Sequence, residues 1–305
     1  MKLNALRAGW DDFWFKPASP APIALYRILF GAMVLSYFAA LSVDTLMWFG
    51  QKGLLTRETA SRLHPWPHIN LFQLLPPGDA WVIALFALFL LAALCLTLGL
   101  FTRFSAFLLW LALLSVHRRN PLMIGGGGIF MQIACFYLIF SRAGDAFSID
   151  KLIRKKWGSA SGPPTLSAPW AQRLIQIQLA TLYFWTFYWK IHGSQWLDGT
   201  AVYYISRVED YWRFHIPFLF DHLLTIKLLT WGTLLLEFSL GVLVWFKPLR
   251  TPLIAAGILF HLMLDVTLNI PYFQWVMITA YATFIYPEDL DSFIAKISAV
   301  KISKP

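Results

Sequence analysis

Charged residues are scarce in this sequence: they make up 13% of its 305 residues, whereas soluble domains contain about 25%. Apolar residues reach 58% and occur in long blocks. The block Trp81–Leu100 carries no charge over twenty residues, which as a helix would span about 30 Å, the thickness of a bilayer core. This composition excludes an ordinary soluble domain and predicts a multi-pass integral membrane protein.

Cysteine is also scarce, and the two copies, Cys95 and Cys135, both fall inside apolar runs. This placement favours buried core residues over a disulfide or a metal site. In the stretch HPWPH, His64 and His68 have no third ligand nearby, and the prolines favour an extended turn. We therefore expect no metal site.

The net charge of +9 does not indicate a nucleic-acid partner, because Lys and Arg lie in short segments between the apolar blocks. The lipid bilayer is the expected partner, and membrane topology accounts for this distribution. If the N-terminus is cytoplasmic, the inner connections hold more Lys and Arg than the outer ones, and the densest cluster, in 142–169, lies inside. The sequence thus predicts a protein of the cytoplasmic (inner) membrane with both termini, including a tail at 291–305, in the cytoplasm.

The N-terminal segment 1–17 is predicted to be an amphipathic helix that lies on the membrane surface. It lacks the apolar core and the cleavage site of a signal peptide. The residues on its apolar face are Leu3, Leu6, Trp10, Phe13 and Trp14.

The chain is predicted to be all-α, with about eight transmembrane helices. The spans are 22–44, 79–100, 104–117, 126–141, 170–190, 222–246, 252–270 and 271–287. A break is expected at Pro271, between the last two spans. The outer segments 45–78 and 191–221 are rich in aromatic residues, and we expect them to be structured loops that cover a cavity.

Ionisable residues at membrane depth are candidates for a functional site. Glu237 lies nine residues before the end of its span, and His261 lies nine residues after the start of the next. Because the connection between them is tight, both side chains are expected about 14 Å from the surface, facing each other. Asp265 and Asn269 follow His261 at helical spacing and would extend a polar stripe.

Three explanations of this stripe remain open: a structural hydrogen-bond network, the lining of a cavity, or a proton path. Arg27, about one turn into the first span, is expected either to reach the inner interface or to pair with a buried acid. Lys190 ends an apolar run rich in aromatic rings, in YWKIHGSQWLDGTAVYY. It is either an interfacial anchor or a base at a reaction centre.

Several stretches are similar to a known family. They are RILFGAMVL, RNPLMIGGGGIF with SRAGDAFSID, LYFWTFYWKIHGSQWLDGTAVYY, and LEFSLGVLVWF with FHLMLDVTLNIPYFQWVMI. The sequence resembles the HTTM (horizontally transferred transmembrane) domain, which includes the membrane domain of vitamin K-dependent gamma-carboxylase. The resemblance implies one such domain over residues 18–290.

In the carboxylase, the lysine that matches Lys190 is regarded as the base that deprotonates vitamin K hydroquinone. The resemblance therefore implies Lys190 as the candidate base, with a reduced quinone as the cofactor if the protein is catalytic. His261 and Glu237, which would shape the cavity, complete the candidate catalytic residues. An amine among rings loses hydration, which favours the neutral, basic form. The residues expected around the substrate or quinone are Trp196, Asp198, Tyr203, Tyr204, Asp265, Asn269 and Trp275.

One motif departs from the family pattern. Gly125–Gly128 occupies a position where many members carry polar groups, and the carboxylase has an Asn-His pair nearby. The carboxylase's lumenal domain has no expected counterpart, so substrate recognition would require a partner protein.

Three functions follow as hypotheses. The first is maturation of a secreted peptide at the outer face with partner proteins, as in systems resembling the sporulation-delaying-protein toxin. The second is a carboxylase-like enzyme that uses a quinol, with Lys190 as its base. The third is a transporter or a proton channel, which the short polar stripe favours least.

Overall fold

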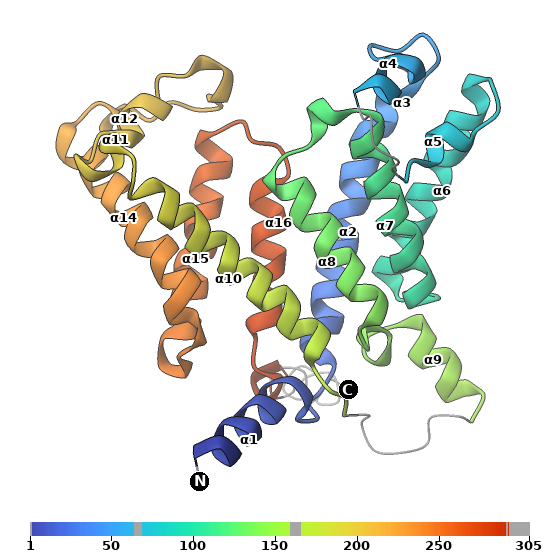
Figure 1. Ribbon diagram of the computed structural model, residues 1–305, viewed down its shortest axis with the longest axis horizontal. Helices are drawn as coiled ribbons and strands as arrows, with labels where there is room; N and C mark the ends of the chain where they lie inside the picture. Colours follow the sequence, from blue (N-terminus) through green and yellow to red (C-terminus); the bar gives the residue numbers. More distant parts are fainter. Residues whose placement is uncertain (1, 64–68, 159–165, 291, 293–305) are drawn as a thin grey trace, which may run out of the picture. The chain divides into compact units, whose positions relative to one another are not determined.

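The computed structural model describes residues 2–63, 69–158, 166–290 and 292. The regular elements in these ranges are helices, in agreement with the predicted all-α class (Figure 1). The chain forms two compact units, residues 1–175 with 285–305, and residues 176–284. The HPWPH stretch and, apart from residue 292, the predicted tail 291–305 lie outside the described residues.

Four helices are long and apolar enough to cross a membrane. They are α2 (Ala21–Val43), α6 (Asp79–Leu98), α14 (Leu223–Val242, continued by a turn to Trp245) and α15 (Lys247–Thr267). The other predicted spans contain α7 (Thr102–Arg119), α8 (Gly126–Phe140), α10 (Trp170–Lys190) and α16 (Phe273–Ala280). The number of spans, eight, stays a prediction, whereas helices at all eight places are confirmed.

One boundary was predicted wrongly. α15 begins at Lys247 rather than at 252, because Lys-Pro-Leu-Arg forms its first turn and not a loop. Pro248 is compatible with this first turn, because N–H groups in the first turn of a helix have no carbonyl partner within it. The N–H that proline lacks is therefore not needed there. α15 ends at Thr267 and α16 begins at Phe273, so the predicted break around Pro271 is confirmed.

In the unit formed by residues 1–175 and 285–305, α2, α6, α7 and α8 pack one on the next. The predicted loop 45–78 is structured in its described part, with α3 (Thr45–Phe49), α4 (Arg57–Arg62) and α5 (Leu71–Leu74). Phe49 of α3 stacks on Phe72 of α5 at 5.1 Å between ring centroids. Both rings also contact Phe86 of α6, with centroid distances of 5.0 and 6.1 Å, and these contacts attach the loop to that helix.

Arg27 follows neither of its two predicted arrangements. Its side chain is fully buried, and the guanidinium donates to four backbone carbonyls. The acceptors and the nitrogen–oxygen distances are Leu96 (2.7 Å), Thr97 (2.8 Å), Ala143 (3.2 Å) and Phe147 (2.6 Å). Arg27 thereby joins α2 to the end of α6, where the Leu96 carbonyl also accepts from the Gly99 N–H, and to the turn after α8.

Replacing Arg27 with methionine is expected to lower the free energy of unfolding by about 3 kcal/mol or more, because buried carbonyls lose their donors. Denaturant unfolding in detergent micelles measures this loss. Arg62, which is exposed and pairs with Glu58, provides the matched Arg62→Met control, with an expected change within about 0.5 kcal/mol. Equal effects of the two substitutions would contradict the role assigned to Arg27.

In the unit formed by residues 176–284, α14 and α15 pack as antiparallel neighbours, as their short connection predicted (Figure 1). The predicted loop 191–221 is structured and contains α11 (Ser194–Leu197), α12 (Ala201–Ile205) and α13 (Pro217–Phe220). Its middle is held by a hydrogen bond from the Arg213 N–H to the Thr267 carbonyl, 3.0 Å.

Asp221, at the end of this loop, contacts two basic side chains from earlier in it. Its carboxylate accepts from Arg207 at 2.7 Å and lies 3.2 Å from His215 Nε2. The hydrogen bond with His215 and the charge of Arg207 hold the pKa of Asp221 below its usual value.

Candidate functional site

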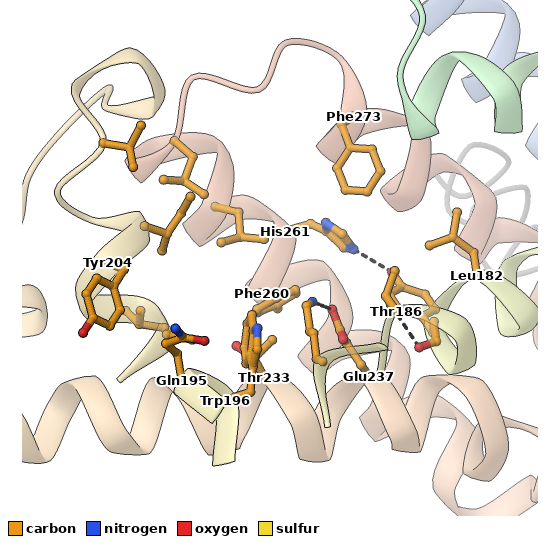
Figure 2. Close-up of a pocket in the computed structure, with 18 residues that line it drawn as sticks. Leu182, Thr186, Gln195, Trp196, Tyr204, Thr233, Glu237, Phe260, His261 and Phe273 are labelled. Carbon is orange, nitrogen blue, oxygen red and sulfur yellow. Dashed lines mark hydrogen bonds and ion pairs between the residues drawn. The ribbon is translucent and has the colours of Figure 1, made fainter. Parts of the chain in front are cut away.

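A cavity of about 560 Å³ lies within the unit formed by residues 176–284. α10, α12, α14 and α15 contribute most of its wall, and Phe273 of α16 closes one side (Figure 2). The lining is mainly apolar. Its polar members are Tyr183, Thr186, Lys190, Gln195, Tyr204, Thr233, Glu237 and His261.

Lys190 and Glu237 form an ion pair in this cavity. Lys190 is the last residue of α10, where a cation is favoured by the helix dipole, and Glu237 projects from the C-terminal third of α14. The lysine Nζ also lies 4.8 Å from the ring centroid of Trp196. The side chain of Glu237 is only 7% exposed, and its second oxygen, Oε2, is buried and forms no hydrogen bond of ordinary geometry with the described residues, although the Thr186 side chain lies next to the carboxylate.

Such an oxygen is unusual, because buried carboxylate oxygens normally accept hydrogen bonds. Glu237 therefore contributes a buried carboxylate to the cavity wall with hydrogen-bonding capacity that is not fully used. Lys190 is not a simple interfacial anchor, since its partner is a buried acid.

His261 belongs to a second polar group on the same wall. Its Nε2 lies 2.6 Å from the Tyr183 hydroxyl, and its Nδ1 lies 2.6 Å from Gln274 Oε1. Because the amide oxygen can only accept, Nδ1 carries the proton and Nε2 accepts from Tyr183. The Tyr183 hydroxyl also lies 2.5 Å from that of Tyr281. Both ring nitrogens of His261 are thus engaged.

The expected pairing of Glu237 with His261 is therefore corrected. Both side chains reach one cavity, as their equal depth predicted, but each has other partners. Lys190 comes from α10, and its spatial position could not be inferred from the connection between α14 and α15. Tyr183 and Thr186, which precede Lys190 on the same face of α10, were missed, although their helical spacing was a usable signal.

The motif Asp-Gly-Thr shapes the cavity wall without lining it. Asp198 accepts from the backbone N–H of Thr200 at 2.9 Å and from its hydroxyl at 2.5 Å. Gly199 has a φ of 83°, and a Cβ there would lie 2.8 Å from Lys227 Cγ and 3.0 Å from the Trp231 ring. Only glycine permits this close approach to α14. The motif therefore positions α11 and α12 against α14.

Of the residues expected around a substrate, Trp196 and Tyr204 line the cavity. Tyr203 instead lies under the guanidinium of Arg207, 4.6 Å from its ring centroid. Trp275, on α16, is largely exposed and is not part of the lining.

The predicted polar stripe does not continue beyond His261. Asp265 lies 3.7 Å from Arg213, outside the cavity lining. α15 ends at Thr267, so Asn269 does not share its face, and the Asn269 backbone N–H donates to the Tyr211 carbonyl at 2.8 Å. Asp265 leaves the predicted stripe because it faces Arg213, and Asn269 leaves it because the helix ends at Thr267 and not at 270.

One glycine of the run 125–128, Gly128, has a packing explanation within the first unit, whereas a Cβ on Gly125 would contact nothing. A Cβ on Gly128 would lie 2.7 Å from His117 Cε1, so the imidazole occupies the space of a side chain there. His117 is buried and lies 2.6 Å from Gln132 Nε2 and 3.3 Å from the Tyr37 hydroxyl. The polar groups near Gly128 are thus His117 of α7 and Gln132, which lies one turn further along α8.

Comparison with known proteins identifies the family. The profile of the HTTM domain matches residues 15–289, which is nearly the whole chain. No solved structure matches the chain in this comparison. With this match and four helices of membrane-crossing length, the chain belongs to the HTTM family of membrane proteins.

Proposed function

We propose that the cavity binds an uncharged, lipid-soluble molecule with a hydroxyl-bearing head group, such as a reduced quinone, and that the site removes a proton from it. The observation that carries this proposal is the Lys190–Glu237 pair inside a mainly apolar cavity. A volume of about 560 Å³ is typical of small-molecule sites.

The charges of the site support an uncharged ligand. Lys190 and Glu237 compensate each other, so an additional buried charge would have no counterion. A neutral hydroxyl could donate to Glu237 Oε2, the buried oxygen that forms no hydrogen bond of ordinary geometry with the described residues. The apolar wall, with Leu264, Leu268 and Phe273, would hold the hydrocarbon part.

The ion pair also indicates which group accepts the proton. In the pair, the Lys190 ammonium carries three protons and cannot accept another. The ligand's O–H bond would break with its proton passing to Glu237 Oε2, and the electron pair would stay on the ligand oxygen. Lys190 would then stabilise that oxyanion, so we assign the base to Glu237 and the electrostatic role to Lys190.

His261 would act as a positioning residue. Its two hydrogen bonds hold Tyr183 and the start of α16 in place around the cavity. The protein is proposed to lie in the inner membrane with both termini in the cytoplasm, which rests on the distribution of Lys and Arg.

Cavity-filling variants test ligand binding. The protein is purified from membranes supplied with a reduced naphthoquinone, and the retained quinone is extracted and quantified by mass spectrometry. Thr233→Trp, which fills the cavity, is expected to lower retention about tenfold or more. Leu235→Trp, on the exposed side of the same helix, is the matched control. Equal retention by the two variants would overturn the proposal.

A role in peptide maturation with partner proteins is a second candidate, supported by a different observation. The segment next to the cavity exposes several aromatic side chains, a composition typical of protein interfaces. They are Tyr203, Tyr204, Tyr211, Phe214 and Phe218. Mass spectrometry of a co-expressed secreted peptide, with and without this protein, would detect a carboxyl-group mass shift or altered processing. An unchanged peptide would argue against this role.

A further inference from the structure

Two grooves adjoin the start of α7 and the end of α8, in the unit formed by residues 1–175 and 285–305. One, of about 550 Å³, lies between the start of α7, the turn 141–145 and α9 (Ile149–Lys156). The other, of about 450 Å³, lies between the start of α2, the end of α8 and the segment 166–172. Arg103 and Arg142 line both grooves.

The acids in the larger groove are already engaged. Asp145 binds Arg154 at 2.9 Å and Arg142 at 3.4 Å, while Asp150 accepts from the Thr102 N–H at 2.9 Å and hydroxyl at 2.7 Å. The side chain of Arg142 stays 57% exposed, and Arg103 is exposed as well. This arrangement presents guanidinium groups to an external anion.

α9 carries further basic residues next to this groove. Lys151, Lys155 and Lys156 are exposed on a helix that also exposes Leu152. The helix is followed by Trp157, which is 79% exposed. A short helix with exposed apolar and basic sides is typical of an element that lies in a membrane interface.

Two phenylalanines beside the groove are held in an unusual conformation. Phe101 and Phe147 both have a φ of 47°, which bulky residues rarely adopt. Both remain exposed, at 69% and 41%. Asp150 accepts from the Phe101 N–H, and Arg27 donates to the Phe147 carbonyl, so a hydrogen-bonded frame keeps these strained residues in place.

We propose that this end of the unit binds the head groups of anionic phospholipids. Arg103 and Arg142 would contact the phosphate, α9 would lie along the lipid surface, and Phe101 and Phe147 would enter the interface. The positive charge of the arginines complements an anionic head group. The exposed apolar side chains nearby favour a lipid over a soluble anion, and they are Phe101, Phe147, Leu152 and Trp157. α2 begins and α6 ends here, and a helix of membrane-crossing length ends at a membrane surface. This inference does not depend on the proposed function of the cavity.

The test is native mass spectrometry of the full-length protein in detergent, titrated with palmitoyl-oleoyl phosphatidylglycerol or phosphatidylcholine. The wild type is expected to retain the anionic lipid preferentially. The variant Arg103→Gln/Arg142→Gln is expected to lose roughly thirtyfold in affinity for phosphatidylglycerol, since each basic residue near an anionic surface contributes about fivefold. Lys155→Gln/Lys156→Gln tests α9 separately while Arg103 and Arg142 stay in place, and a loss of similar size is expected because these lysines would also lie near the lipid surface.

The variant Lys52→Gln/Arg62→Gln removes the same charge from exposed positions elsewhere in the unit and should bind the anionic lipid as the wild type does. Three outcomes would overturn the proposal. One is equal loss in this control, and another is equal retention of both lipids by the wild type. The third is displacement of phosphatidylglycerol by inorganic phosphate at equal concentration, which would assign the arginines to a soluble anion.

Discussion

Replacing Lys190 with alanine is expected to lower the free energy of unfolding by about 3 kcal/mol, because the buried carboxylate of Glu237 loses its counterion. The double variant Lys190→Met/Glu237→Leu removes both charges and fills a similar volume. We expect its stability to stay within about 1 kcal/mol of the wild type, since apolar replacement of a complete buried pair is often neutral.

Denaturant unfolding in detergent micelles would measure both variants. Lys52→Ala, at an exposed position, controls for the loss of one lysine and is expected to change stability by less than about 0.5 kcal/mol. If Lys190→Ala were as stable as this control, Lys190 and Glu237 would not form a buried pair. A double variant less stable than Lys190→Ala would mean that the two side chains stabilise the unit through separate contacts.

The second large effect concerns proton transfer. Glu237→Gln keeps the shape of the side chain but removes its basic oxygen, so proton removal from the bound quinol is expected to slow at least about 100-fold. Lys190→Arg keeps the positive charge and cannot serve as a neutral base. Because we assign Lys190 an electrostatic role, Lys190→Arg is expected to retain the rate within about tenfold, while Lys190→Ala is expected to lose it.

The measurement is the oxygen-dependent consumption of a reduced naphthoquinone by vesicles that contain the protein, compared with empty vesicles. A deprotonated quinol reacts faster with oxygen, so the rate reports on proton removal. If Lys190→Arg were as inactive as Lys190→Ala and Glu237→Gln stayed active, the base would be Lys190. If vesicles with the wild-type protein consumed the quinol no faster than empty vesicles, the proposed quinol chemistry itself would be wrong, whichever residue is the base.

The residues of the polar site were largely predictable one by one. Charges inside apolar blocks are costly, so Lys190, Glu237 and His261 stand out in the sequence alone. Equal distances from a short connection also placed Glu237 and His261 at one depth, and both line the cavity. The HTTM resemblance is confirmed over residues 15–289.

The partners of these residues were not predictable. A pattern along one chain states which residues share a helix face, but not which other helix that face meets. Glu237 therefore pairs with Lys190 of α10, and His261 meets Tyr183, also of α10, rather than Glu237. Asn269 failed for a local reason, since α15 ends two residues earlier, at Thr267.

The sequence by itself determined the helical class, the positions of the apolar helices and the three ionisable residues of the cavity, Lys190, Glu237 and His261. Hydrophobic blocks and helical periodicity are properties of the sequence alone, and they do not depend on how the helices pack against one another. The tertiary structure decided that Lys190 forms a buried pair, that one oxygen of Glu237 forms no hydrogen bond of ordinary geometry with the described residues, and that Arg27 binds four carbonyls. Hydrogen bonds and ion pairs act over only a few ångströms, so residues far apart in sequence acquire partners only when packing brings them together.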